Sequence, residues 1–171
     1  VEQDGEFYYI AEALLPVLKQ LKGRDKGDYR VTETLKGIEM VGWRYRGPFD
    51  ELPAEQGVKH VVVPWKDVTE TEGTGIVHIA PGCGREDFGL SKEFGLDVIA
   101  PVDEFGVYLP GYDWLTGQNA AEVGQQVAEN LTKKGFLYRP QNYKHRYPTC
   151  WRCKTELIFR LVDEWFISME K

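Results

Sequence analysis

The 171-residue sequence is poor in sulfur and histidine, with three Cys, two Met and three His. It has no apolar run near the roughly 20 residues that a membrane-spanning helix requires, and clusters such as residues 61–63 have only the length of a strand. An odd number of cysteines is a poor disulfide framework. These shortages exclude a disulfide-stapled secreted domain and a helical membrane protein, and they predict a reduced, cytoplasmic chain.

Positive charge is also scarce, because 21 Lys and Arg face 27 Asp and Glu, giving a net charge of −6. This balance argues against a domain that holds nucleic acid mainly by bulk electrostatics. It leaves room for a local basic edge near the C-terminal part, and the alternative is a solvated face. The basic residues of that edge are Lys133, Lys134, Arg139, Lys144, His145, Arg146 and Arg152.

Aromatic residues make up 13% of the chain and apolar residues 42%, which predicts a folded protein. Helical spacing of apolar residues predicts helices over residues 11–22, 87–94 and 119–134, the last stopped by Gly135. Residues 30–35, 60–65, 74–79 and 98–102 read as strands. Since strands outnumber helices without strict alternation, we expect an α+β fold with a barrel-like mixed β-sheet surrounded by a few helices.

Residues 72–88 carry the most chemical information. Gly73 and Gly75 remove side chains on either side of Thr74, so a ligand could approach the backbone there. His78 ends the predicted strand, and a Pro/Gly-rich loop then leads to Asp87. An Asp suits a primary ammonium, and a His can bind a hydroxyl or orient water. The alternatives are a strand-entry turn, a structural His and an N-cap Asp.

Five separated motifs resemble one family. GTGIVHIAP at 73–81, followed by GREDF at 84–88, resembles the editing-domain signature of isoleucyl-tRNA synthetases. HRYPTCWRC at 145–153 and WFISM at 165–169 are similar to the exit from the same insertion, and GWRYRGPF at 42–49 and WLTG at 114–117 also fit. The resemblance covers nearly the whole chain, and several motifs in the right order are more specific than any one.

The resemblance implies a proofreading hydrolase domain that removes wrongly attached amino acid, chiefly valine, from isoleucine tRNA. Asp87 would hold the substrate α-ammonium and His78 would line the pocket and exclude isoleucine; these are the candidate catalytic residues. No Ser/His/Asp or Cys/His nucleophile is evident, so we expect direct attack by water. The implied substrate-binding residues are Gly73, Thr74, Gly75, Ile76, Val77, His78, Ala80, Pro81, Gly84 and Asp87.

The family's Thr-rich upstream segment and its ATP-binding motifs do not occur in this sequence. We therefore expect an N-terminally truncated editing domain over residues 1–144 and an exit segment over 145–171 that leads back to the synthetase core. The implied partners are the acceptor end of tRNA(Ile) and the rest of the synthetase, and we expect a monomer. The alternatives are a valyl- or leucyl-type editing domain, which His78 argues against, and a catalytically incomplete module that only binds tRNA or docks.

Cys150 and Cys153 form a CxxC pair, which is half of a Zn(Cys)4 site. The resemblance implies that the partner pair lies outside this chain, so zinc is expected only in the longer protein. The alternative is a pair of reduced thiols without metal. We expect no cofactor in this fragment, with ATP confined to the absent synthetase core.

Overall fold

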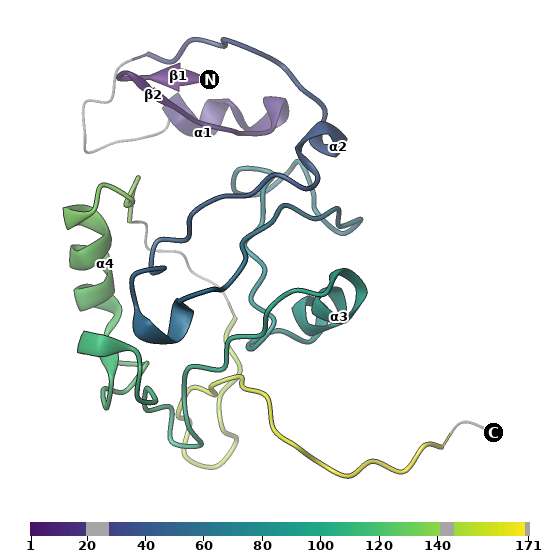
Figure 1. The fold of residues 1–171 in the computed structure, drawn as a ribbon, viewed down its shortest axis with the longest axis vertical. Helices are drawn as coiled ribbons and strands as arrows, with labels where there is room; N and C mark the ends of the chain where they lie inside the picture. Colours follow the sequence, from purple (N-terminus) through teal and green to yellow (C-terminus); the bar gives the residue numbers. More distant parts are fainter. Residues whose placement is uncertain (20–27, 141–145, 170–171) are drawn as a thin grey trace. The chain divides into compact units, whose positions relative to one another are not determined.

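The computed structural model describes residues 1–19, 28–140 and 146–169 (Figure 1). It divides into two units. The first unit consists of Val1–Tyr45 and Val61–Ile79, and the second of Arg46–His60 and Ala80–Lys171. Among the described residues, no helix is long and apolar enough to cross a membrane. The domain boundary predicted at residue 145 falls outside the described residues and stays a prediction.

The first unit begins with a hairpin of β1 (Glu2–Gln3) and β2 (Glu6–Phe7), which pair antiparallel. The turn between them is made by Asp4 and Gly5, whose φ angles are 54° and 80°. An Asp-Gly pair is favoured in such a turn because both of its central residues adopt positive φ. Arg30 extends the pairing, since its backbone exchanges two hydrogen bonds of 2.8 Å with Glu2.

The predicted helix over residues 11–22 is confirmed only in short pieces, η1 (Glu12–Leu14) and α1 (Pro16–Lys19). Residues 20–22 of that prediction lie outside the described residues. A further short helix, α2 (Gly37–Met40), precedes the point where residues 42–43 form backbone hydrogen bonds with Val62. There, Gly42 N donates to Val62 O and Val62 N donates to Trp43 O, both at 2.9 Å.

The second unit contains the two longer helices, α3 (Arg85–Phe94) and α4 (Gly124–Lys133), with η2 (Pro53–Glu55) and η3 (Asp113–Leu115). Its core is a cluster of buried side chains from η3 and from the residues directly before η2, η3 and α4. They are Leu52, Tyr112, Leu115 and Val123, against which Phe49, Ile99, Tyr108, Trp114 and Val127 pack. The core therefore joins chain segments that lie more than 70 residues apart.

The helices predicted over 87–94 and 119–134 are both confirmed, with shifted starts. α4 begins five residues later than predicted because Asn119 forms a local turn instead. Its side-chain oxygen accepts from Ala121 N at 3.0 Å, and its carbonyl accepts from Glu122 N at 3.0 Å. An Asn side chain competes in this way with the helical hydrogen-bond pattern.

The α+β class is confirmed, but regular strands are fewer than predicted. Within the described residues, the one sheet is the β1–β2 hairpin. Three of the segments predicted as strands take part only in isolated bridges, such as Arg44 with Val61 and Val102 with Tyr108, and residues 74–79 form no bridge. β-propensity depends on packing against neighbouring strands, so it does not by itself define a paired segment. The barrel-like sheet is not seen here and stays a prediction.

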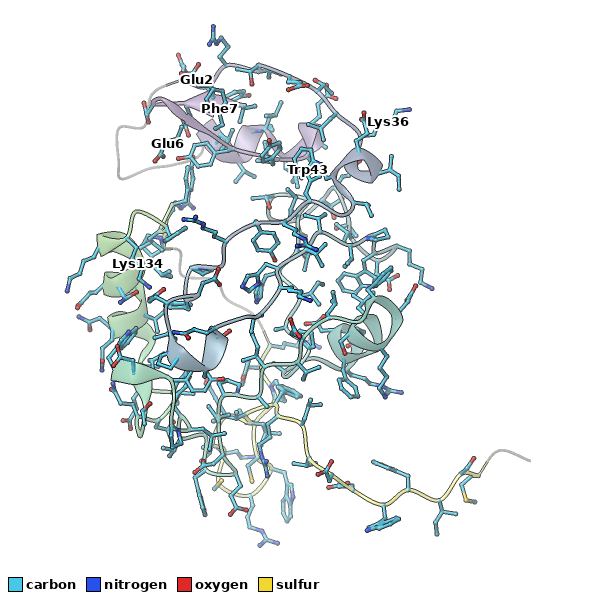
Figure 2. All side chains as sticks on the ribbon, in the orientation of Figure 1. Glu2, Glu6, Phe7, Lys36, Trp43 and Lys134 are labelled. Carbon is cyan, nitrogen blue, oxygen red and sulfur yellow. The ribbon has the colours of Figure 1, made fainter. Side chains whose placement is uncertain are left out.

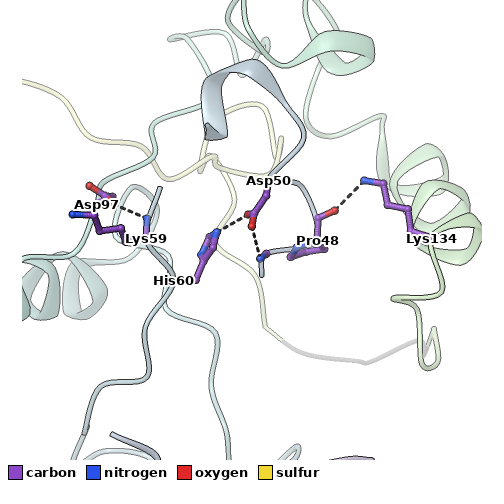
Figure 3. A network of polar contacts seen from close by, with 7 residues as sticks. Pro48, Asp50, Lys59, His60, Asp97 and Lys134 are labelled. Carbon is purple, nitrogen blue, oxygen red and sulfur yellow. Dashed lines mark hydrogen bonds and ion pairs between the residues drawn. The ribbon is translucent and has the colours of Figure 1, made fainter. Parts of the chain in front are cut away.

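A polar network ties together loops of the second unit (Figure 3). Asp50 Oδ1 lies 2.7 Å from His60 Nε2, and Asp50 Oδ2 accepts from Gly47 N at 2.9 Å. An added Cβ on Gly47 would lie 2.5 Å from Asp50 Oδ1. Lys134, at the end of α4, donates to Pro48 O at 2.9 Å and pairs with Glu51. The network thus holds residues 47–51 between His60 and α4.

We expect Asp50→Ala to destabilise the chain by about 1–3 kcal/mol, because it removes the side chain that accepts from Gly47 N and contacts His60 Nε2. The His60 side chain is only 18% exposed, so water replaces the lost partner poorly. Urea unfolding measures the change. Asp97→Ala is the matched control, since Asp97 accepts one exposed hydrogen bond from Lys59 N at 2.9 Å. Equal losses in the two variants would contradict this account of the network.

Glu55 provides a pH-dependent test of the same region. Burial raises the pKa of Glu55 above its ordinary value of 4.5, the charge of His60 lowers it and that of Asp50 raises it. The folded state therefore binds more protons than the unfolded state above pH 4.5, and stability falls as pH rises from there through the folded pKa. We expect Glu55→Gln to unfold at higher temperature than the wild type at pH 7 and to lose that advantage below pH 4.5.

Glu51 is the control for the Glu55 experiment because its shift has the opposite sign. The hydrogen bond from Lys134 lowers the pKa of Glu51. Glu51→Gln should therefore lower stability slightly at pH 7, with the difference from the wild type disappearing as pH falls. Thermal unfolding across pH measures both variants. A gain of stability in Glu51→Gln, or a loss in Glu55→Gln, would contradict the assignment.

Candidate functional site

The candidate site is built on the tight loop of residues 80–84, which leads into α3 within the second unit. Cys83 N and Gly84 N both donate to Ala80 O, at 2.9 and 3.2 Å. Phe88 N then donates to Gly84 O at 2.9 Å, which starts the helix. The Pro/Gly-rich sequence therefore forms a closed turn that brings Ala80 next to the first turn of α3.

Asp87 bridges this loop. It lies in the first turn of α3, and its Oδ2 accepts from Ala80 N at 2.9 Å. The N-cap residue is Gly84, so the interpretation of Asp87 as a simple N-cap is wrong. A negative charge in the first turn of a helix is favoured by the helix dipole. The carboxylate therefore joins the end of the GTGIVHIA segment to α3.

The second oxygen of the Asp87 carboxylate is the chemically available one. In the described part of the chain, the Ala80 bond is the one hydrogen bond found for this carboxylate, which is partly buried. An ionised carboxylate offers about four acceptor positions. Its remaining positions suit a cationic donor, and hydrogen bonds between charged partners are shorter and stronger than neutral ones. The geometry fits the predicted role of holding an ammonium group.

Gly84 was predicted to contact the substrate, and the structure gives it a different neighbour. Its φ and ψ are −120° and 141°, an ordinary extended conformation that any residue adopts. A Cβ added there would lie 2.8 Å from Asp87 Oδ2 and 3.0 Å from Asp87 Cγ. The missing side chain therefore makes room for the carboxylate.

The GTG turn belongs to the first unit. Gly73 and Gly75 have φ angles of 61° and 75°, and Thr74 Oγ1 donates to Ile76 O at 3.2 Å. A Cβ added to Gly75 would lie 2.5 Å from Ala11 Cβ, and Ala11 N donates to Thr74 O at 2.8 Å. The space beside Gly75 is thus taken by Ala11, a neighbour 64 positions away that the sequence analysis does not predict.

Ile76, Val77 and His78 are all exposed, and the strand predicted over residues 74–79 is not formed. Ile76 is 47% exposed and Val77 48% exposed. Apolar side chains that stay accessible are compatible with a pocket wall. Because His78 lies in the first unit and Asp87 in the second, their convergence on one pocket stays a prediction. So do the substrate contacts of Gly73, Thr74, Ala80 and Pro81.

Cys83 lies in the candidate loop but is not activated. Desolvation, followed by the nearby charge of Asp87, raises the pKa of the Cys83 thiol. A thiol is a weak nucleophile until it is deprotonated. Cys83 is therefore protonated at neutral pH and is a poor candidate for covalent catalysis.

The CxxC pair sits on a small hairpin whose strands meet at the Thr149–Glu156 bridge. The hydrogen bond between Cys153 Sγ and the Thr155 hydroxyl, 3.2 Å apart, is the main cause that lowers the pKa of Cys153 to about 7. The thiolate is the form that binds zinc. Over residues 1–19, 28–140 and 146–169, no group of three or more His, Cys, Asp or Glu could hold a metal ion. These residues do not form a complete metal site, and zinc in the longer protein stays a prediction.

Of the residues in the predicted basic edge, Lys134 forms an ion pair with Glu51, whereas Lys144 and His145 lie outside the described residues.

Further along, the chain runs extended through residues 157–169 (Figure 2). Its large apolar side chains are exposed: Leu157, Ile158, Phe159, Val162, Trp165, Phe166, Ile167 and Met169. This extended segment is the largest run of accessible apolar surface in the described sequence.

No protein-family model matches the chain. Individual relatives do match it over nearly its whole length. It is 38% identical over 167 residues to an isoleucine-tRNA ligase of Methanothermobacter thermautotrophicus, covering 97% of this chain and 15% of that protein. It is 40% identical to isoleucine-tRNA ligases of Pyrobaculum aerophilum, over 167 residues, and Pyrococcus horikoshii, over 180 residues. These two matches cover 97% and 100% of this chain, and 17% and 16% of those proteins.

These relatives define the chain as a segment of an aminoacyl-tRNA synthetase. The chain belongs to the isoleucyl-tRNA synthetase family. It spans about 15 to 17% of the length of the relatives it matches.

Proposed function

We propose that this chain is the proofreading part of an isoleucyl-tRNA synthetase and hydrolyses valine that has been wrongly attached to isoleucine tRNA. The observation that carries the proposal is the Asp87 carboxylate, anchored to Ala80 N at 2.9 Å with its other oxygen available. An aminoacyl ester differs from an ordinary ester by the α-ammonium beside the reacting carbonyl. A fixed carboxylate is the group that recognises this feature.

The reaction is attack by water on the ester carbonyl at the terminal ribose. The water oxygen bonds to the carbonyl carbon, the ribose oxygen leaves with a proton, and free valine and tRNA are released. Binding the ammonium at Asp87 would orient the carbonyl, since a positioned substrate reacts faster than a mobile one. The raised pKa of Cys83 disfavours a thioester intermediate. His78 would line the pocket and limit the size of the side chain admitted.

The expected partners follow from this role. They are the acceptor end of tRNA(Ile) carrying a wrong amino acid and the rest of the synthetase chain. The exposed apolar segment over residues 157–169 supports contact with further synthetase sequence, because the chain spans only about 15 to 17% of its relatives. A second candidate function, a module that only docks and does not hydrolyse, rests on that same segment.

Preformed valyl-tRNA(Ile) and isoleucyl-tRNA(Ile) test the proposal. Each is incubated without ATP, so that no recharging occurs, with this chain and with a full-length isoleucine-tRNA ligase that contains it. We expect valine to be released and isoleucine to be retained. Release by the full-length ligase alone would restrict the activity to the assembled enzyme. If neither protein releases valine, the hydrolase proposal is overturned and the docking module is favoured.

A further inference from the structure

Gly84 has no conformational reason to be glycine. Its φ of −120° and ψ of 141° lie in the extended region open to every residue. It is also the N-cap of α3, a position where Ser, Thr, Asp and Asn are at least as favourable. Glycine, which cannot cap the helix with a side chain, therefore occupies a position that suits residues whose side chains can.

The space beside Gly84 explains this choice. The atoms nearest to an added Cβ all belong to Asp87: Oδ2 at 2.8 Å, Cγ at 3.0 Å and Cβ at 3.3 Å. The same Oδ2 accepts from Ala80 N at 2.9 Å. A side chain on Gly84 would push the carboxylate away from the Ala80 amide, and the carboxylate would rotate out of its present direction.

We infer that Gly84 is a positioning residue, whose missing side chain holds the Asp87 carboxylate in the direction that recognises the α-ammonium of the aminoacyl ester. The inference rests on the proposed function and adds the residue that sets the direction of its recognition group. Gly84 acts through Asp87 and contributes no group of its own. The added methyl of Gly84→Ala removes no charge and no hydrogen-bonding side chain, so its effect comes from the displaced carboxylate of Asp87.

Two esters of tRNA(Ile) provide a readout that general damage to the fold would not move. One carries valine, and the other carries the matched 2-hydroxy acid, in which a hydroxyl replaces the ammonium. The ratio of their kcat/KM values measures recognition of the ammonium. In the full-length ligase without ATP, we expect Gly84→Ala to lower that ratio by about 10-fold or more, the size of a displaced charge-assisted hydrogen bond. A purely structural role would lower both rates equally and leave the ratio unchanged.

Gly89→Ala is the matched control, because Gly89 lies in α3 and an added Cβ meets nothing within 4 Å. It should keep the wild-type ratio. Asp87→Glu is a second variant that leaves the loop glycines untouched. It retains the charge but places the carboxylate one methylene further out, so positioning predicts a lower ratio here as well. If Gly84→Ala does not fold, as judged by thermal unfolding, Asp87→Glu still decides the question.

The outcomes separate the two claims. A wild-type ratio in Asp87→Asn would mean that Asp87 does not recognise the ammonium, and the proposed site would fail. A low ratio in Asp87→Asn beside wild-type ratios in Gly84→Ala and Asp87→Glu would overturn the positioning role alone. Low ratios in Asp87→Asn, Gly84→Ala and Asp87→Glu, with Gly89→Ala unchanged, are the result we expect.

Discussion

Replacing Asp87 by Asn is expected to slow the hydrolysis of valyl-tRNA(Ile) by about 100-fold in kcat/KM, which corresponds to about 2.7 kcal/mol. This size is that of a hydrogen bond to a charged group lost from a recognition site. The Asn side chain has nearly the same shape as Asp, and its carbonyl oxygen can still accept from Ala80 N, 2.9 Å away in the wild type. The loop is therefore retained while the charge that would bind the ammonium is removed.

Glu86→Gln is the control for this substitution. Glu86 precedes Asp87 in the first turn of α3 and is exposed, so the two variants remove the same charge from the same turn. Any general effect on the helix dipole or on tRNA attraction appears in both. We expect Glu86→Gln to stay within about 3-fold of the wild type, as most exposed substitutions do. The measurement is the release of labelled valine by the full-length ligase in the absence of ATP.

If Asp87→Asn hydrolyses valyl-tRNA(Ile) at the same rate as Glu86→Gln, Asp87 does not take part in substrate recognition. Aminoacylation with isoleucine provides the second reference, since that activity requires the synthetase core and should be unchanged in both variants. Parallel losses of aminoacylation and hydrolysis would point to unfolding. A selective loss of hydrolysis in Asp87→Asn supports the proposed role.

Helices were predictable because their signals are local. Val123 and Val127 lie four residues apart on one helical face, and Gly135 stops the pattern, so α4 could be placed from a short stretch of sequence. The strands were overpredicted because a strand is defined by its pairing with another segment, which is not a local property of the sequence. Residues such as Val61 and Val102 have high strand propensity, yet each forms a single bridge, with Arg44 and Tyr108 respectively.

The sequence indicates the residue types of the candidate site but not their contacts. An acid after a Pro/Gly-rich loop makes Asp87 a candidate recognition group, but the sequence does not show whether its carboxylate caps its own helix or contacts another segment. The Ala80 bond depends on the path of residues 80–84, which is determined by backbone hydrogen bonds that many sequences could make. The contact of Ala11 with Gly75 is harder still to predict, because the two residues are 64 positions apart and neither has a polar side chain.

The position of the loop in the second unit depends on a close backbone contact at Gly82. Gly82 is buried, and the nearest atom to an added Cβ is the carbonyl oxygen of Ile99, well inside contact distance. The next nearest atoms, Ile99 C at 2.8 Å and Ala100 Cα at 3.5 Å, are also backbone atoms. Backbone atoms cannot rotate away as a side chain does, so either the loop or residues 99–100 must move to admit a methyl group.

We therefore expect Gly82→Ala to destabilise this chain by about 3 kcal/mol, at the upper end of the cost of overpacking. Domains of this size have only about 5–15 kcal/mol of stability in total, so the loss is large. Gly89→Ala should instead raise the free energy of unfolding by up to about 1 kcal/mol, because alanine is favoured over glycine in an exposed helix. Urea unfolding of the two variants beside the wild type measures both shifts. The φ of Gly82 lies outside the left-handed region, so backbone strain does not contribute to the loss of stability and the experiment tests the contact with Ile99 alone. A Gly82→Ala variant as stable as the wild type would mean that this contact does not hold the loop.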